Sequence, residues 1–212
     1  MYIVYGKSKI GEGTLVSENV LIGYPTWAEL KENGGTFNES SLKEIDGTII
    51  GNNCILRAFG ILYSKTTIGD SVQTGHHFLV REESVIGNNT LIGSNVIIEN
   101  KCKIGNNVSI QSGVYIPTYS VIDDNVFLGP NSVLTNDKYI GYKDPRKRGL
   151  EGVHIEEKCA IGANSTILPG LRIGHHSVIG SGSVVTKDVP PRSVVAGVPG
   201  RVIDKVVIDE KQ

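Results

Sequence analysis

Residues 86–116 read IGNNTLIGSNVIIENKCKIGNNVSIQSGVYI, and in this stretch an isoleucine returns at every sixth position. The same period extends in both directions along the chain. The longest series comprises Ile50, Leu56, Leu62, Ile68, Thr74, Val80, Ile86, Ile92, Ile98, Ile104, Ile110, Ile116, Ile122, Leu128 and Leu134. Two shorter series comprise Ile10, Val16 and Ile22, and then Ile155, Ile161, Ile167, Ile173, Ile179 and Val185. A fixed internal period of this kind indicates a repeat architecture.

A period of six excludes the two common regular structures. Six residues turn an α-helix through about 600°, so successive aliphatic side chains would lie on opposing faces. A flat β-strand would need an apolar residue at every second position. The spacing instead predicts an all-β coil in which each hexapeptide is one short strand and one turn. Three hexapeptides complete one turn of a triangular prism, and the coils stack as parallel strands about 4.8 Å apart.

The position four residues after each aliphatic residue tests this prediction. It holds mostly small side chains, as a narrow prism interior requires, and all three cysteines fall there, at Cys54, Cys102 and Cys159. We interpret the cysteines as buried packing residues rather than catalytic thiols. Their number and spacing match no metal-binding motif.

Two segments interrupt the period within a single expected domain over residues 1–212. Residues 24–47 separate the first series from the second, and residues 138–152 separate the second from the third. Connections of this length are usually functional. The AELKE sequence at 28–32 is compatible with a short helical turn. From about residue 190 to 212 we expect a last strand or two and then a helix or tail that covers the open end of the coil.

The composition narrows the possible partners. The formal net charge is −1, from 21 Lys and Arg against 22 Asp and Glu, which predicts no nucleic-acid-binding surface. No apolar stretch approaches the length of a membrane span, and the N-terminus does not resemble a signal peptide. We therefore expect a cytoplasmic protein with neither a nucleic-acid nor a membrane partner.

The repeat resembles that of the hexapeptide-repeat acyltransferases over nearly the whole chain, from Ile10 to Ile203. This resemblance implies a left-handed parallel β-helix, although ordinary parallel crossovers are right-handed. The segments at 80–82 (VRE), 86–116 and 126–137 (VFLGPNSVLTND) are similar to N-acyltransferases that act on nucleotide-linked amino sugars. The resemblance implies a homotrimer without a metal, with each active site in a groove between two prisms. Acetyl-CoA or another acyl-CoA is expected toward the C-terminal coils and the nucleotide-linked sugar toward the N-terminal coils.

Asn136 and Asp137 are the first candidates for the site. Transfer to an amine needs an unprotonated amine, a donor for the developing oxyanion and close placement of both ligands. The resemblance implies that this pair contacts the sugar and orients its amine, with Asp137 holding or deprotonating the ammonium. The alternative is that Asp137 only begins a turn. Many O-acyltransferases of this superfamily have a base histidine near this position, and its absence argues against a hydroxyl acceptor.

His76 and His77 form a second candidate group, in a coil that also contains the irregular Thr74. His77 is predicted to act as the base for the amine or to bind the nucleotide-linked sugar, or else it is a solvated corner residue. The repeat places His77 and Asp137 three coils apart, roughly 14 Å along the prism. His77 and Asp137 therefore cannot contact the same amine together unless a loop bends back. Candidate contacts to the acceptor are His76, Arg81, Glu83 and Arg146.

The CoA contacts follow from the resemblance alone. Small residues that would let the pantetheine arm lie close to the coils are Gly162, Ala163, Gly180 and Ser181. Lys187 and Arg201 are expected near the CoA phosphates. The charge run that contains Arg146 lies in the 138–152 segment and either meets a pyrophosphate or is solvated.

Three other functions are alternatives to amino-sugar N-acylation. The first is an O-acetyltransferase for a sugar or a small hydroxyl acceptor. The second is a non-catalytic hexapeptide-repeat protein that serves as an assembly surface. The third, a zinc carbonic anhydrase, needs three histidines at one metal, and the five histidines are too widely spaced along the prism for that.

Overall fold

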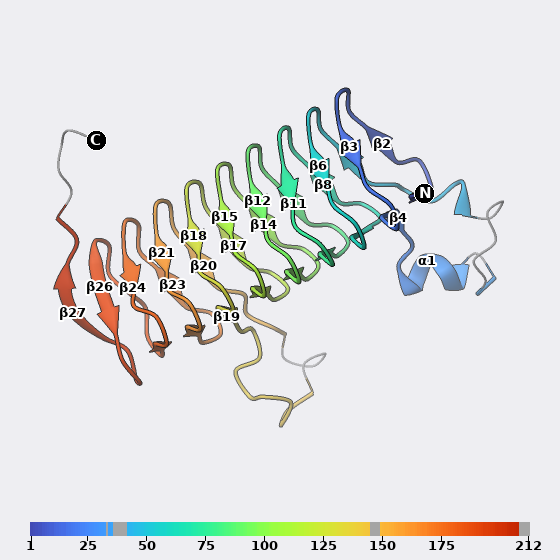
Figure 1. Ribbon diagram of the computed structural model, residues 1–212. Coiled ribbons are helices and arrows are strands. Elements are labelled where there is room, and N and C mark those ends of the chain that lie inside the picture. Colours follow the sequence, from blue (N-terminus) through green and yellow to red (C-terminus); the bar gives the residue numbers. More distant parts are fainter. Residues whose placement is uncertain (33, 36–41, 145–148, 208–212) are drawn as a thin grey trace.

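The computed structural model describes residues 1–32, 34–35, 42–144 and 149–207 of the 212-residue chain. Over these residues three parallel sheets wind into a prism of about 10 turns, so the predicted left-handed parallel β-helix is confirmed. The coils stack in sequence order from the N-terminal to the C-terminal end, and the described loop residues 138–144 project sideways from them (Figure 1).

The first face of the prism, sheet A, has nine strands in the described chain. They are β1 (Ile3–Val4), β4 (Leu21–Tyr24), β7 (Ile61–Tyr63), β10 (Leu79–Val80), β13 (Ile97–Ile98), β16 (Tyr115–Ile116), β19 (Val133–Leu134), β22 (Thr166–Ile167) and β25 (Val184–Val185). Sheet B has eight described strands. They are β2 (Lys9–Ile10), β5 (Ile49–Ile50), β8 (Thr67–Ile68), β11 (Val85–Ile86), β14 (Lys103–Ile104), β17 (Val121–Ile122), β20 (His154–Ile155) and β23 (Arg172–Ile173).

The third face, sheet C, has ten described strands and includes the C-terminal hairpin. They are β3 (Leu15–Val16), β6 (Ile55–Leu56), β9 (Gln73–Thr74), β12 (Leu91–Ile92), β15 (Ser109–Ile110), β18 (Phe127–Leu128), β21 (Ala160–Ile161), β24 (Val178–Ile179), β26 (Ser193–Ala196) and β27 (Arg201–Lys205). The chain passes from A to B to C, and we name the turns between faces the A–B, B–C and C–A corners.

The period of six sets both the register and the core. The second residue of almost every strand points inward, and Ile98, for example, pairs with Ile116 of the next coil in sheet A. These inward residues form one continuous buried cluster along the prism. Asparagines such as Asn53, Asn89 and Asn107 occupy the left-handed backbone region at the corners, with φ of 56°, 56° and 55°. Asparagine tolerates this conformation better than most residues, which explains the recurring Gly-Asn-Asn sequence.

The cysteines are buried packing residues, as predicted. Cys54, Cys102 and Cys159 are at most 1% exposed, and the thiols lie inside the prism. Burial raises the pKa of Cys102 to about 12 and that of Cys159 to about 11, so neither forms a thiolate near neutral pH.

Phe78 is one exception to the rule of small interior side chains, and a glycine makes room for it. Its ring is 1% exposed, and a Cβ atom at Gly60, in the coil below, would overlap that ring. Thr74 is the one polar member of the aliphatic series. Its buried hydroxyl has a hydrogen-bond partner, because Oγ1 accepts from the Arg57 backbone N–H at 2.9 Å.

The segment 24–47 carries the short helix α1 (Trp27–Glu32) at the N-terminal end of the prism (Figure 1). Glu29 closes a capping box with Thr26, accepting from its backbone N–H at 2.8 Å and from its hydroxyl at 2.9 Å. Glu29 also accepts from Ser64 at 2.6 Å and lies 3.6 Å from the Lys65 ammonium. One buried carboxylate therefore fastens the helix to the third coil, which carries Ser64 and Lys65.

Replacing Glu29 with glutamine is expected to lower the free energy of unfolding at pH 7 by about 1–3 kcal/mol. Burial alone would raise the pKa of Glu29, but the hydrogen bonds from Ser64 and Thr26 and the charge of Lys65 outweigh it and hold that pKa below the usual 4.5. Because the folded pKa is the lower one, this stabilisation is present above pH 4.5 and is lost as the pH falls below it.

Urea unfolding of the wild type and the Glu29→Gln variant at several pH values measures this contribution. The gap between the two should narrow below pH 4.5. Glu44→Gln is the matched control, because the Glu44 side chain is 82% exposed and should contribute little at any pH. An equal loss in both variants would contradict the role given to Glu29.

The C-terminal cover is a hairpin over the described residues. Strand β26 pairs in parallel with β24, and β27 then runs antiparallel to β26. The expectation of one or two last strands is met up to residue 207, and residues 208–212 lie outside the described chain.

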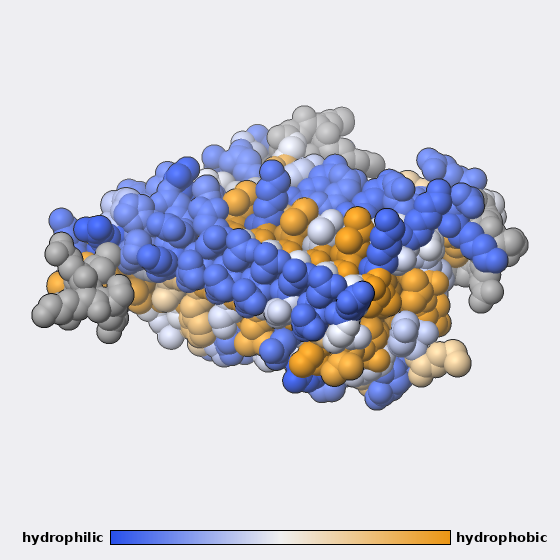
Figure 2. Space-filling view, turned by 90° about the horizontal axis from the view of Figure 1, so that it is seen from above, coloured by the Kyte–Doolittle hydropathy of each residue, from blue (hydrophilic) through white to orange (hydrophobic). Residues whose placement is uncertain are grey.

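The outward residues differ between the faces. Those of sheet A are mostly apolar and include Leu21, Ile61, Leu79, Ile97, Tyr115 and Val133. Those of sheet C include Leu15, Ile55, Leu91, Phe127 and Val178. Sheet B mixes charged and apolar residues and includes Lys9, Lys103, His154 and Arg172. Figure 2 shows apolar patches on both sides of a polar band that runs along the molecule.

Candidate functional site

A cavity of about 570 Å³ opens at the A–B corner, at the base of the 138–152 loop. Its walls come from successive coils of the C-terminal half and from the first residues of the loop. The lining residues are Tyr115, Val133, Leu134, Thr135, Asn136, Asp137, Lys138, Ile140, Leu168, Pro169, Leu171 and Thr186. A mostly apolar cavity of this size with a few convergent polar groups is typical of a small-molecule site.

Asn136 stands at the end of a polar ladder that climbs the A–B corner. The Thr118 hydroxyl donates to Asn100 Oδ1 at 2.7 Å, and the Asn136 amide donates to the Thr118 carbonyl at 3.3 Å. These three residues are 18 apart in sequence and therefore stack on successive coils, as three hexapeptides per turn require. Thr135 beside it donates to the Ile167 carbonyl at 2.8 Å. Regular strands thus fix both polar residues at the rim of the cavity.

Asp137 begins the loop and organises its first turn. Its Oδ1 accepts the Tyr139 backbone N–H at 2.9 Å, and its Oδ2 accepts the Gly141 backbone N–H at 2.6 Å. The turn-forming role weighed from the sequence is thus present in the structure, while Asp137 also lines the cavity. Its proposed contact with an ammonium group remains a prediction.

His76 and His77 lie on the C–A corner, the other edge of sheet A from Asn136. The ring of His77 stacks on that of Phe59, with centroids 4.8 Å apart and planes 5° apart. His76 donates its backbone N–H to Ser94 Oγ of the next coil at 3.0 Å. The structure therefore separates His77 from Asp137 around the prism as well as along it, and one chain does not bring them together.

Two of the remaining acceptor candidates, Arg81 and Glu83, are already engaged within the chain. Arg81 is bound by Glu82 and Glu99, at 3.0 Å and 3.3 Å. Glu83 lies 3.8 Å from the Lys101 ammonium on the exposed corner. Arg146 lies outside the described residues.

The residues expected to hold CoA fall into two groups. Gly162, Ala163, Gly180 and Ser181 lie at the C–A corner, after β21 and β24. Gly162 is required by coil stacking itself, because a Cβ there would collide with the Ser181 backbone. Lys187 and Arg201, in contrast, both line one cavity of about 220 Å³ near the C-terminal hairpin. Asp188 lines the same cavity, so two cations and one carboxylate surround it.

The apolar wall of the main cavity was missed from the sequence. Leu168, Pro169 and Leu171 come from the coil after the loop, so the insertion hides their proximity to Asn136. A signal was present, because Leu171 is a large residue at a position that is small in most repeats. Tyr115 also lines the cavity, but nothing in the repeat distinguishes it from other outward residues, so the sequence did not identify it.

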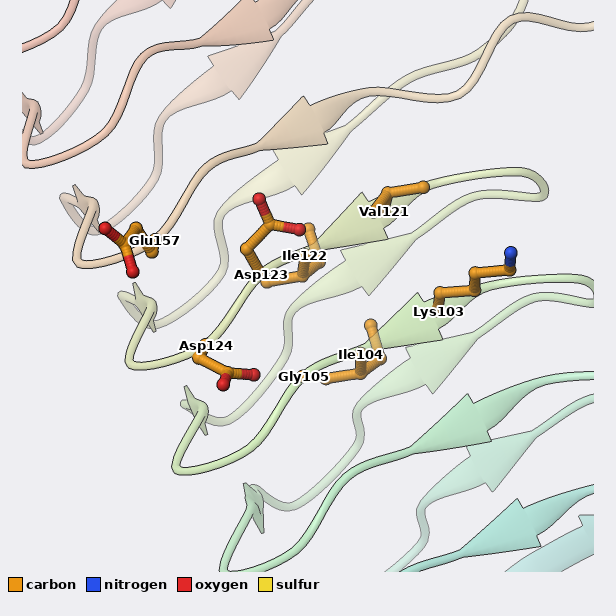
Figure 3. A pocket seen from close by; sticks show the side chains of 8 residues that line it. All are labelled: Lys103, Ile104, Gly105, Val121, Ile122, Asp123, Asp124 and Glu157. Carbon is orange, nitrogen blue, oxygen red and sulfur yellow. The ribbon is translucent and has the colours of Figure 1, made fainter.

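A second cavity of about 480 Å³ lies on sheet B and contains none of the predicted site residues. Figure 3 shows Asp123, Asp124 and Glu157 on neighbouring coils, with Lys103 at the other end. Asp123 pairs with His154 at 3.0 Å, and Asp124 accepts the Asn106 backbone N–H at 2.7 Å. At least two of these carboxylates therefore bind neighbouring coils.

The described residues contain neither a candidate membrane span nor a candidate metal cluster. None of the helices there is long and apolar enough to cross a membrane. No three or more His, Cys, Asp or Glu side chains within the described ranges are grouped so that they could hold a metal ion.

The prism of six-residue repeats defines a hexapeptide-repeat protein. The model of the bacterial transferase hexapeptide family (six repeats) matches residues 83–118, 101–136 and 152–187. The chain belongs to this hexapeptide-repeat family.

Curated relatives include both O- and N-acetyltransferases. The galactoside O-acetyltransferase of Lactococcus lactis subsp. lactis (strain IL1403) is 50% identical over 66 residues, which are 30% of this chain and 32% of that protein. The 2,3,4,5-tetrahydropyridine-2,6-dicarboxylate N-acetyltransferase of Clostridium perfringens (strain SM101 / Type A) is 53% identical over 57 residues, 27% of this chain and 23% of that protein. The chain thus spans about a third or less of the length of these relatives.

The fold has a solved counterpart of similar extent. The UDP-N-acetylglucosamine acyltransferase from Campylobacter jejuni superposes with a TM-score of 0.71 at 17% identity, covering 93% of this chain and 70% of that chain. At this identity the likeness shows the prism fold alone.

Proposed function

We propose that the protein transfers an acyl group from acetyl-CoA or a slightly longer acyl-CoA to the amine of a nucleotide-linked amino sugar. The observation that carries this proposal is the 570 Å³ cavity in which Thr135 and Asn136 face apolar walls at the base of the loop. The names of the relatives, which include both O- and N-acetyltransferases, support the acyl-transfer class.

The reaction is one displacement at the thioester carbonyl. The amine nitrogen attacks the carbonyl carbon, a tetrahedral oxyanion forms, and the C–S bond breaks to give the amide and CoA, which takes up the proton that the nitrogen loses. Asn136 is proposed to hold the amine against the thioester, and Asp137 to fix the loop and attract the ammonium form. Backbone N–H groups at the corner are suited to stabilise the oxyanion.

An amine acceptor is favoured over a hydroxyl by the residues of the cavity. The described lining residues include no histidine, and a hydroxyl needs a strong general base far more than an amine does. O-acetylation of a sugar is the second candidate, because the galactoside O-acetyltransferase of L. lactis is among the relatives. Acceptors of both kinds therefore belong in the same assay.

The placement of the two predicted ligand groups supports a homotrimer. Asn136 lies at one edge of sheet A, and Gly162 and Gly180 lie at the other, so one chain cannot supply both to one thioester. A ring of identical subunits joins two different surfaces of each chain. The apolar outward residues of sheets A and C provide two such surfaces, and the A–B corner of one subunit would then face the C–A corner of the next.

The test is release of free CoA when the purified protein is mixed with acetyl-CoA and a panel of acceptors. We expect thiol release with 3-amino or 4-amino dideoxy nucleotide-sugars and little with galactosides or maltose. If CoA is released only with the hydroxyl sugars, the acceptor group is a hydroxyl and the proposed amine acceptor is wrong. No release across the panel, and no protection by acyl-CoA in thermal melts, would instead favour a non-catalytic assembly protein.

A further inference from the structure

Phe59 and His77 form an exposed aromatic stack at the C–A corner. Their ring centroids are 4.8 Å apart and their planes are 5° apart. This separation matches the spacing of neighbouring coils, about 4.8 Å, because the two residues occupy the same position on successive coils. Phe59 is 49% exposed and His77 is exposed as well, so the described chain leaves both rings open to solvent.

The stack occupies a corner position that holds asparagine or glycine in the other coils. The position has a positive φ throughout the described chain. Its occupants are Asn19 (φ 57°), Phe59 (65°), His77 (55°), Asn95 (56°), Gly113 (76°), Asn131 (56°), Asn164 (56°) and Gly182 (70°). Asparagine and glycine accept this left-handed conformation readily, whereas phenylalanine does not. Because Phe59 is also half exposed, packing of the prism does not account for an aromatic ring there.

The outer faces of the stack are accessible. Its neighbours at the same corner position are Asn19 on the N-terminal side and Asn95 on the C-terminal side, and both are short and exposed. A planar ring therefore has room to extend the stack by one layer. Exposed aromatic side chains of this kind bind nucleobases, since every base offers a π face.

The corner around the stack carries no negative charge over five coils. The corner residues of these coils are 57–59, 75–77, 93–95, 111–113 and 129–131. They include Arg57, His76 and His77 but no aspartate or glutamate. Arg57 Nη1 donates to the Thr74 carbonyl at 2.5 Å, which fixes the guanidinium at the coil that carries His77. The phosphates that accompany a nucleobase thus meet no carboxylate on this corner.

We infer that the Phe59–His77 stack is a platform for a nucleobase, and that this base belongs to the nucleotide of the acceptor. In the proposed homotrimer the C–A corner of one subunit faces the cavity of the next. His77 lies three coils, roughly 14 Å along the prism, from the height of Asn136. The ribose and diphosphate of an extended nucleotide-linked sugar span such a distance, with the amine still at Asn136. The inference rests on the proposed function and adds the contacts that hold the base.

The adenine of CoA is the other nucleobase in the proposed reaction. Lys187 and Arg201, the residues expected near the CoA phosphates, line a cavity at the C-terminal hairpin. The stack lies in the N-terminal half of the prism, several coils away from them. Its position therefore favours the base of the acceptor.

Steady-state kinetics of Phe59→Ala and His77→Ala tests the inference. Each variant should raise the KM for the nucleotide-linked amino sugar by about 10-fold, the effect of losing one base–aromatic stack. The KM for acetyl-CoA should stay unchanged. His77→Phe should retain the wild-type acceptor KM, because a ring remains in the stack. His176→Ala is the matched control, since His176 has a similar φ of 58° but lies on the B–C corner, and it should change neither KM.

Binding of nucleotides without turnover is a second measurement. Calorimetric titration of wild type with UDP and dTDP should show binding of at least one of them, and Phe59→Ala should weaken it by about 10-fold. Adenosine 3′,5′-diphosphate, which carries the base of CoA, should bind wild type and Phe59→Ala equally. Circular dichroism spectra confirm that each variant is folded.

The outcomes separate this inference from the proposed function. CoA release by the wild type with an unchanged acceptor KM in Phe59→Ala overturns the inference alone. A raised KM for acetyl-CoA with an unchanged acceptor KM also overturns it, because the base on the stack would then be adenine. An equal rise in KM for a free amino sugar, which has no base, overturns it as well. Weakened UDP or dTDP binding in Phe59→Ala without CoA release from any amino sugar supports the platform and overturns the proposed function.

Discussion

The Asn136→Ala variant is expected to lose about 100-fold in kcat/KM for the amino-sugar acceptor, the usual effect of removing one well-placed polar group from an acyl-transfer site. The Asn136 side chain lines the cavity and is held by Thr118 at 3.3 Å, so its removal alters placement of the acceptor without disturbing the core. Initial rates of CoA release at varied acceptor concentration measure the loss.

Asn88→Ala is the matched control for this variant. Asn88 also caps a neighbouring coil, accepting the Asp70 backbone N–H at 2.8 Å, but it lies on the B–C corner away from the cavity. It should retain wild-type kcat/KM. We also expect His77→Ala to lower kcat/KM less than Asn136→Ala does. The reverse order would indicate that the amine binds at the C–A corner.

The Phe78→Ala variant is expected to lower the free energy of unfolding by about 3–5 kcal/mol. Phe78 is the largest side chain buried in the prism at 1% exposure, and its ring fills the space that Gly60 leaves open. Removing the ring leaves a cavity beside Gly60, which has no side chain to fill it. Equilibrium urea unfolding followed by circular dichroism gives the difference.

Phe59→Ala separates burial from the mere loss of an aromatic ring. Phe59 is 49% exposed and stacks on His77, so its removal should cost about 1 kcal/mol. Similar losses in the two variants would show that Phe78 does not support the prism interior as the structure indicates.

The fold followed from the sequence because its period admits one geometry. A returning aliphatic residue at every sixth position fixes strands, faces and register together, and residues 18 apart, such as Asn100, Thr118 and Asn136, accordingly stack on successive coils. The same logic identified the cysteines as interior packing. The insertion after Leu134 interrupts the six-residue period, so the period does not predict which later residues lie beside Asn136. Leu168 and Leu171, which follow the loop in sequence, line the cavity.

The site was harder to predict because side-chain partners do not follow from stacking. Arg81 looked available for an acceptor, yet Glu82 and Glu99 bind its guanidinium. Asp137 was predicted to meet an ammonium, and the structure adds two backbone N–H groups of the loop to its partners. Residues at a similar height along the prism axis can also lie on different corners, and height alone does not reveal that separation.

The most direct test of the proposed function is a crystal structure of the protein with CoA and a 3-amino or 4-amino dideoxy nucleotide-sugar. The proposal predicts the amine nitrogen within hydrogen-bond distance of the Asn136 side chain, inside the cavity formed with Thr135 and Leu168. It also predicts the CoA sulfur beside that nitrogen. An acceptor amine bound at the His76–His77 corner, or an empty cavity with both ligands bound elsewhere, would contradict it.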